Sequence, residues 1–338
     1  MRKVVLLAVS VAVLGLAGCG APVSPPPIST PVASVTASPA PLEPIQLGVG
    51  YVPNVQFAPF YVAQEKGFFA QQGLMVTLEY GMETDFVALT GQGQRQFSIA
   101  SGDQVILARA QKLPVVYVLK WYQRFPVGVM ALAQTGIETP QQLEGHSVGI
   151  PGLYGASYAG WKALVYAAHL DETKIRLDSI GFTQAEAITQ GKVDAAVVYI
   201  TNEPVQLRQA GSKVSLIQVS DYIDMVSNGL ITNEATIRDH PDLVRRMVHA
   251  SLQGLEYTLA HPDEAFSISR SKVPEITDQN APAQRAVLDA SLALWRTDAP
   301  GVSDRQAWID TLNAMQATGL VQGGLDAQAM FTNQFVQP

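Results

Sequence analysis

Residues 45–80 read IQLGVGYVPNVQFAPFYVAQEKGFFAQQGLMVTLEY, and this stretch is the clearest indicator of the fold class. Its apolar pattern predicts a strand over 45–51, a helix over 58–69 that ends by Gly73, and a second strand over 75–80. A strand, a helix and a second strand at this spacing favour a parallel sheet covered by helices on both faces. The sequence therefore indicates an α/β protein.

The alternation of strands and helices continues along the chain and then restarts. Strands over 97–100 and 115–119, with a helix over 104–110 between them, complete a first set. A second set is expected from strands over 146–150, 175–180, 193–199 and 214–219 and from helices over 157–170 and 184–190. Two similar sets in one chain indicate two lobes with a cleft between them.

The C-terminal third is expected to be mostly helical. A helix begins at His240-Pro241, and apolar residues then follow at steps of three and four, which is typical of a core-facing helix. Two more helices are expected over 282–295 and 304–318, the last ending at Gly319. These apolar positions are assigned to the core.

The first residues have the features of a secretory signal peptide (1–18). Arg2 and Lys3 precede an apolar run over 4–16 that is too short to span a bilayer. The run ends in Leu-Ala-Gly-Cys, which resembles the lipobox of bacterial lipoproteins and implies that Cys19 is lipidated. We therefore expect the protein at the extracytoplasmic face of the cell membrane, held by its lipid. Cleavage at an ordinary signal-peptidase site, or retention as a signal anchor, is the alternative.

Residues 19–44 are expected to form a flexible stalk. Pro, Ser, Thr and Ala fill most positions after Cys19, and Glu43 is the only charged residue. Such a segment has too little apolar bulk to offset the entropy of ordering. The folded part is expected to begin at Ile45.

Composition and charge exclude several classes of function. The formal net charge of −7 makes the chain a poor nucleic-acid binder. Cys19 is the only cysteine, so a lipidated chain has no disulfide, no thiol nucleophile and no cysteine-based zinc site. The five histidines show no metal-ligand spacing, and they are His146, His169, His240, His249 and His261. No metal site, no cofactor and no catalytic activity is expected.

The run GYVPNVQFAPFYVAQEKGFF over 50–69, followed by Gly-Leu-Met-Val, is similar to the opening of the NMT1/THI5-like substrate-binding proteins. Further matches are Ser-Gly-Asp-Gln at 101–104, Leu-Pro-Val-Val at 113–116 and Val-Asp-Ala-Ala at 193–196. The resemblance implies an extracytoplasmic receptor that serves the permease and ATPase subunits of an ABC importer. It also implies a type II periplasmic-binding-protein fold, in which two lobes joined by two crossovers close on a solute.

On this fold the first lobe is expected over 45–132 and 227–338, and the second lobe over 133–226. The crossovers are expected near 131–135 and 226–229. In open α/β sheets a ligand lies beyond the carboxyl ends of the strands, which selects residues in the loops that lead into helices. These candidate ligand-binding residues are Tyr51, Asn54, Phe57, Ser101, Asp103, Trp121, Tyr122, Tyr154, Gly155, Ser157, Tyr199, Asn202 and Glu203.

The loop Gly-Leu-Tyr-Gly-Ala-Ser at 152–157 leaves three interpretations open. Gly149, Gly152 and Gly155 are spaced as in a dinucleotide-binding loop, but no acidic residue follows at the required distance. The loop could instead offer backbone N–H groups to a ligand, or it could be a structural turn.

The aromatic candidates indicate the class of solute. A flat heterocycle gains apolar burial and stacking between such rings, while Asn54, Asp103, Asn202 and Glu203 suit polar ring edges or hydroxyls. Pyrimidine binders of the family commonly carry Asn-x-x-His where this chain has Asn54-x-x-Phe57. The chain therefore looks like the riboflavin-binding branch, with riboflavin as transported ligand rather than cofactor.

Three alternatives remain. A thiamine-pyrimidine precursor is the alternative ligand for the same kind of importer. A pyrimidine-synthase-like enzyme shares the fold, but such enzymes rely on a cysteine-rich motif that this chain lacks. A scaffolding lipoprotein would not require a cleft that is lined with aromatic residues.

Overall fold

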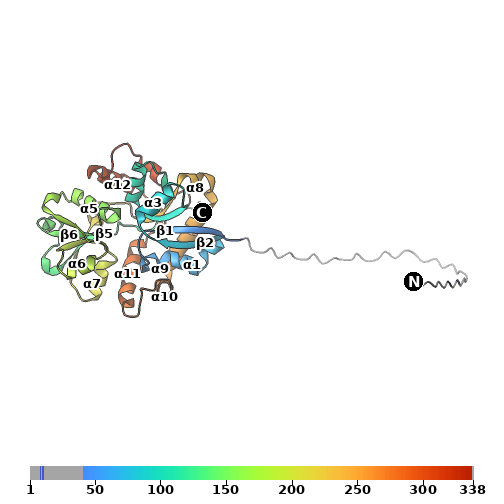
Figure 1. Ribbon diagram of the computed structural model, residues 1–338, viewed down its shortest axis with the longest axis horizontal. Coiled ribbons are helices and arrows are strands. Elements are labelled where there is room, and N and C mark those ends of the chain that lie inside the picture. The colour runs from blue at the N-terminus through green and yellow to red at the C-terminus, as the bar shows by residue number, and fades with distance from the viewer. Residues whose placement is uncertain (1–7, 9, 11–40, 337–338) are drawn as a thin grey trace, which may run out of the picture. The chain divides into compact units, whose positions relative to one another are not determined.

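The computed structural model describes residues 41–336, together with residues 8 and 10 (Figure 1). Cys19, the stalk up to residue 40 and the rest of the expected signal peptide lie outside the described residues. Within the described part of the chain, no helix combines the length and the apolar character that crossing a membrane requires.

The described body contains two five-stranded sheets. The first has the strand order β2-β1-β3-β10-β4. Its strands are β1 (Glu43–Val49), β2 (Leu74–Tyr80), β3 (Phe97–Ser101), β4 (Val115–Lys120) and β10 (Asn228–Asn233). The second has the order β7-β6-β8-β5-β9. Its strands are β5 (Val127–Leu132), β6 (Ser147–Ile150), β7 (Arg176–Ser179), β8 (Ala195–Tyr199) and β9 (Val214–Gln218).

Helices follow the strands of each sheet as the alternating pattern predicts. Those of the first lobe are α1 (Ala58–Glu65), α2 (Phe68–Gln71), α3 (Glu83–Gly91) and α4 (Gly102–Ala110). Those of the second are α5 (Gly155–Ala167), α6 (Gln184–Thr189) and α7 (Glu203–Gln209). The C-terminal helices are α8 (Glu234–Asp239), α9 (Pro241–Ala260), α10 (Pro262–Lys272), α11 (Ala281–Trp295) and α12 (Arg305–Ala317).

The folded body begins before residue 45, which corrects the expected end of the stalk. The backbone N–H of Glu43 donates to the carbonyl of Gly73 at 2.8 Å, and the Glu43 carboxylate pairs with Arg246 at 2.7 Å. These contacts fix β1 two residues earlier than expected. The helix expected over 58–69 is divided into α1 and α2 because Gly67 adopts φ +72, a left-handed conformation that interrupts a helix.

Residues 127–132, which fall in the range expected for the first lobe, form a strand of the second sheet, β5, and no strand was predicted there. β5 lies within 45–132, yet it pairs antiparallel with β8 and β9. The first crossover is therefore the segment 121–126 between β4 and β5, rather than 131–135. The return to the first sheet lies just before β10, which pairs antiparallel with β3 and β4.

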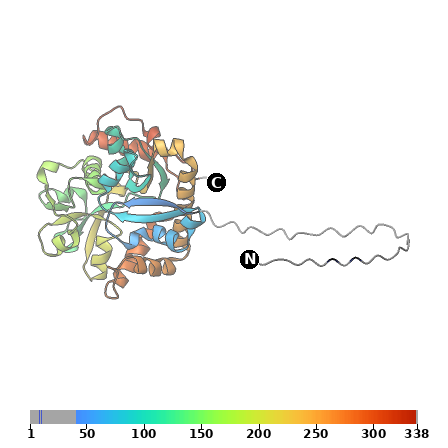
Figure 2. The same cartoon turned by 45° about the vertical axis from the view of Figure 1, so that its right-hand side comes forward.

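The C-terminal helices contact both lobes. α11 packs against α7, and α12 packs against α5, so each reaches a helix of the second lobe. Figures 1 and 2 show these helices, coloured orange to red, on both sides of the first sheet. The expected helix start at residue 304 is an N-cap, because the Asp304 side chain accepts from the backbone N–H of Ala307.

Close packing of α9 on α1 anchors the long C-terminal helix. Gly254 faces α1 so closely that an added Cβ would lie 2.2 Å from the carbonyl oxygen of Pro59. The two helices can approach to this distance only because residue 254 has no side chain.

We expect Gly254→Ala to lower the free energy of unfolding by about 1–3 kcal/mol, because the added methyl group overpacks this contact. Urea denaturation of the two proteins measures the difference. Gly323→Ala is the matched control, since nothing lies within 4 Å of its added Cβ. Equal losses in both variants would show that the close contact is not responsible.

Candidate ligand-binding site

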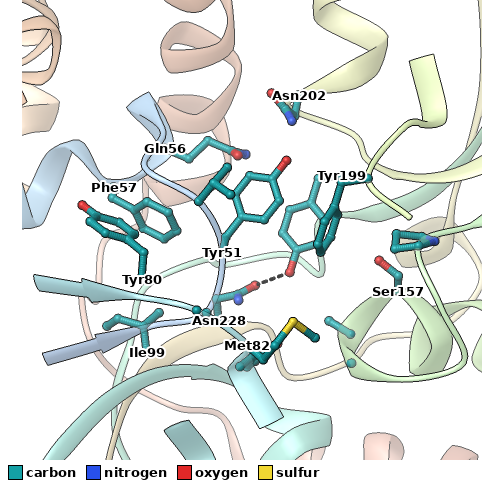
Figure 3. A pocket seen from close by; sticks show the side chains of 18 of the residues that line it. Tyr51, Gln56, Phe57, Tyr80, Met82, Ile99, Ser157, Tyr199, Asn202 and Asn228 are labelled. Carbon is teal, nitrogen blue, oxygen red and sulfur yellow. Dashed lines mark hydrogen bonds between the residues drawn. The ribbon is translucent and has the colours of Figure 1, made fainter. Parts of the chain in front are cut away.

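A cavity of about 330 Å³ lies between the two sheets, at the edge where their parallel strands end (Figure 3). Both lobes line it, and its volume lies in the range of small-molecule sites. The residues predicted from the sequence that line it are Tyr51, Phe57, Trp121, Tyr122, Tyr154, Gly155, Ser157, Tyr199, Asn202 and Glu203. The structure thus brings these residues together, and their role in binding remains a prediction.

Three predicted residues do not line the cavity. Asn54 caps the short 3-10 helix Val55–Phe57 by accepting from the backbone N–H of Gln56 at 3.0 Å. Ser101 donates to Glu83, and Asp103 is fully buried with its Oδ2 accepting from Gln104. All three residues lie at the end of a strand or the start of a helix, as expected. Their side chains, however, form hydrogen bonds with neighbouring residues and do not line the cavity.

Aromatic rings from the first lobe form one wall of the cavity. The Phe57 ring lies 6.1 Å from the Tyr80 ring and 5.8 Å from the Trp121 ring, centroid to centroid. Trp121 is only 2% exposed and packs against Trp295 at 5.5 Å. Trp121 therefore belongs mainly to the core behind the wall, and Phe57 and Tyr80 offer the accessible surface (Figure 3).

Contacts between the lobes hold the cavity closed on two sides. Gln56 Nε2 donates to Thr201 Oγ1 at 2.6 Å, and the Tyr199 hydroxyl donates to Asn228 Oδ1 at 3.3 Å. Both bonds join the first lobe to the second beside the cavity, and Figure 3 shows the one between Tyr199 and Asn228.

Exposed apolar side chains mark the rim of the cavity. Tyr51 contacts Phe182 edge to face, with ring centroids 5.3 Å apart, and these residues come from opposite lobes. Phe182 is 53% exposed and Tyr154 is 42% exposed. Large rings that remain exposed at a cavity mouth are typical of a binding site rather than of a core.

Two carboxyl groups line the cavity in an apolar environment. Burial raises the pKa of Glu203 to about 7, and burial together with nearby Asp103 raises the pKa of Glu83 to about 7. Glu83 Oε1 accepts from the backbone N–H of Ser101 at 2.6 Å and from its hydroxyl at 2.9 Å. Burial, with Glu203 nearby, also raises the pKa of Tyr51 to about 12, so its hydroxyl stays protonated.

Several residues of the lining were not predicted from the sequence, for identifiable reasons. Glu83 follows β2 and Phe182 follows β7, so the strand-end rule could have selected both. Asn228 begins β10, and its place at the cavity depends on that strand being antiparallel, which no local pattern reveals. Gln56 lies in a segment whose side-chain directions depend on the 3-10 turn.

The loop at 152–157 leads directly into α5, which begins at Gly155. Gly155, Ala156 and Ser157 line the cavity, and the cap residue Tyr154 makes no side-chain capping bond. The first N–H groups of the helix are therefore available to an acceptor atom. This arrangement favours the donor-loop interpretation, and Gly155 has φ +68, which a residue with a side chain rarely adopts.

We expect Glu83→Gln to flatten the dependence of stability on pH. The folded-state pKa of Glu83, about 7, exceeds its ordinary value of 4.5, so the folded state holds a proton in this interval that the unfolded state releases. The free energy of unfolding should rise as pH falls through the interval, by on the order of 1–3 kcal/mol for this group. The variant should lose that contribution and exceed the wild type in stability at about pH 8.

Denaturation at several pH values measures this slope. Glu256→Gln, which changes an exposed carboxylate on α9, is the control and should keep the wild-type slope. A Glu83→Gln protein with an unchanged slope would contradict the assignment.

Comparison with known proteins identifies a family and several relatives of the chain. The model of the family described as NMT1/THI5 like matches residues 54–265. The riboflavin-binding protein RibY of Chloroflexus aurantiacus is 39% identical over 96% of this chain and 95% of its own length. The formylaminopyrimidine-binding protein of Halalkalibacterium halodurans is 30% identical over 86% of this chain and 90% of its own length.

Solved structures share the fold at low identity. The periplasmic aliphatic sulphonate binding protein SsuA from Escherichia coli superposes with a TM-score of 0.70 at 14% identity, over 86% of this chain and 92% of its own. This likeness confirms the expected two-lobed periplasmic-binding-protein fold. With the family model matching more than half of the chain and a relative matching nearly all of it, the chain belongs to the NMT1/THI5-like family.

Proposed function

We propose that this protein is an extracytoplasmic binding lipoprotein that takes riboflavin into the cavity between its lobes and delivers it to the permease of an ABC importer. The observation that carries the proposal is the likeness to RibY along nearly the whole chain. The cavity supports it independently, because its lining combines aromatic rings with hydrogen-bonding groups.

The chemistry of the lining suits a flat ring system with a hydroxylated tail. Tyr51, Phe57 and Tyr80 offer ring faces and edges that gain apolar burial and stacking against an isoalloxazine. Asn202, Asn228 and Glu83 offer amide and carboxylate groups that suit hydroxyls. The phenyl ring of Phe57, in place of an imidazole, enlarges the stacking surface.

An aminopyrimidine precursor of thiamine is the second candidate ligand. The relative that is named for binding formylaminopyrimidine matches 86% of the chain, although at the lower identity of 30%. A pyrimidine is smaller than an isoalloxazine and leaves more of the aromatic wall uncovered. Riboflavin is therefore the favoured ligand.

An enzymatic role is disfavoured. Relatives named 4-amino-5-hydroxymethyl-2-methylpyrimidine phosphate synthase include one from Legionella pneumophila that is only 22% identical. None of the described residues that line the cavity is a histidine, lysine or cysteine, which leaves Glu83 and Glu203 as its candidate bases. Binding without bond making is the simpler account of this lining.

We expect Tyr51→Ala and Tyr154→Ala each to weaken riboflavin binding by about 1–3 kcal/mol, because each removes a ring from the rim of the cavity. Quenching of flavin fluorescence on titration with purified protein measures the affinity. Tyr166→Ala is the matched control, since Tyr166 lies on α5, the helix that Tyr154 precedes, is 43% exposed and does not line the cavity. Absence of quenching by the wild type, with thermal stabilisation by an aminopyrimidine instead, would transfer the assignment to the second candidate.

We expect Cys19→Ala to abolish lipid attachment and to move the protein from the membrane fraction to the soluble fraction of the cells that produce it. One or more acyl chains at this cysteine would account for the anchor. Labelling with a radioactive fatty acid, followed by fractionation, measures both effects. A wild-type protein without label would refute the lipoprotein assignment and leave the ligand assignment intact.

A further inference from the structure

The charged side chains that line the cavity all carry the same sign. Among the described residues of the lining, Glu83 and Glu203 are the ionisable acids, and no lysine, arginine or histidine is present. Asp103 lies behind Glu83, close enough to raise its pKa. Asp103 is a third buried carboxyl group that does not reach the cavity itself, and burial raises its own pKa as well.

These carboxyl groups are compensated by hydrogen bonds rather than by cations. Within the described part of the chain, neither Glu83 nor Glu203 forms a salt bridge. Glu203 accepts from the backbone N–H of Tyr199 and from Asn202 Nδ2, each at 3.2 Å. Asp103 Oδ1 is buried with no hydrogen-bond partner among the described residues. Above about pH 7 Glu83 and Glu203 are mostly ionised, and no cation of the described lining neutralises their charge.

The N-terminus of α5 contributes a partial positive charge to the lining of the cavity. A helix N-terminus is equivalent to roughly half an elementary charge, and its effect falls off within the first turn. Two carboxylates therefore outweigh it. Its N–H groups can still donate a hydrogen bond to a neutral carbonyl oxygen of a ligand, since that contact does not require a net positive site.

We propose that Glu83 and Glu203 restrict this cavity to uncharged ligands, so that free riboflavin binds and its 5′-phosphate ester is excluded. The inference rests on the proposed function and adds a basis for its selectivity. A hydroxyl at the end of the tail can donate to a carboxylate, whereas a phosphate monoester carries about −1.5 to −2 charges and only adds repulsion. Like charges brought together in a desolvated site oppose binding strongly.

The exclusion belongs to these side chains and not to the fold. A protein with the same fold, SsuA from Escherichia coli, is named for binding aliphatic sulphonates, which are anions. Two lobes of this architecture can therefore enclose an anion when the lining allows it. Replacing the carboxylates in this chain should accordingly relax the selectivity while leaving the lobes intact.

The test compares the affinities of riboflavin and riboflavin 5′-phosphate for the purified full chain at about pH 8, where most Glu83 and Glu203 carboxyls are ionised. Isothermal titration calorimetry measures both. We expect the phosphate to bind the wild type about 100-fold more weakly, and Glu83→Gln to reduce that ratio by about 10-fold. The amide that replaces the carboxyl group in Glu83→Gln keeps an oxygen for the two Ser101 donors, so folding should persist.

Glu203→Gln provides a second variant, and Glu256→Gln on α9 provides a control that should keep the wild-type ratio. Wild-type affinities within about threefold of each other, or an unchanged ratio in both cavity variants, would overturn the inference and leave the riboflavin assignment standing. If riboflavin itself does not bind, the proposed function fails. The affinities of hydroxymethylpyrimidine and its phosphate are then compared in place of those of riboflavin and its phosphate. The same ratios are expected of that pair, and equal affinities for its two members would overturn the inference.

Discussion

The structure depends on one topological constraint, which is that each sheet contains a single reversed strand that arrives from the other lobe. The chain leaves the first sheet at the end of β4 and enters the second as β5, and it returns as β10. A strand that enters a sheet from the cleft must run opposite to strands that end at the cleft, and both β5 and β10 are antiparallel to their neighbours. The same constraint makes the carboxyl edges of the two sheets face each other, so that loops from both lobes line one cavity.

The lining of the cavity contains two kinds of group that are costly for stability, exposed aromatic rings and buried carboxyl groups. Aromatic rings at its wall and rim favour a planar apolar guest, and Phe182 and Tyr154 remain exposed at some cost in hydration. Glu83 and Glu203 remain carboxyl groups in an apolar site, where burial raises their pKa values. Both features suit the proposed ligand, which has a flat ring system on one side and neutral hydroxyl donors on the other.

The sequence patterns predicted those features of the fold that short-range interactions determine. The strand and helix periods identified every described strand except β5 and β10, but they missed the helices α3, α7, α8 and α10. The rule that ligands lie beyond strand ends selected residues that do line the cavity, Tyr51 and Tyr199 among them. The failures involve long-range geometry. No strand was predicted at β5, and its sheet is decided by its pairing with β8 and β9. Asn228 reaches the cavity only through the reversal of β10, and Asp103 is fully buried on α4.

A crystal structure of the protein grown with riboflavin tests the central claim most directly. We expect the isoalloxazine to lie between the two sheets against Tyr51, Phe57 and Tyr80, with the tail among Glu83, Asn202 and Asn228. Density for the ligand outside this space, or a cavity that remains filled by repacked side chains while riboflavin binds elsewhere, would contradict that claim.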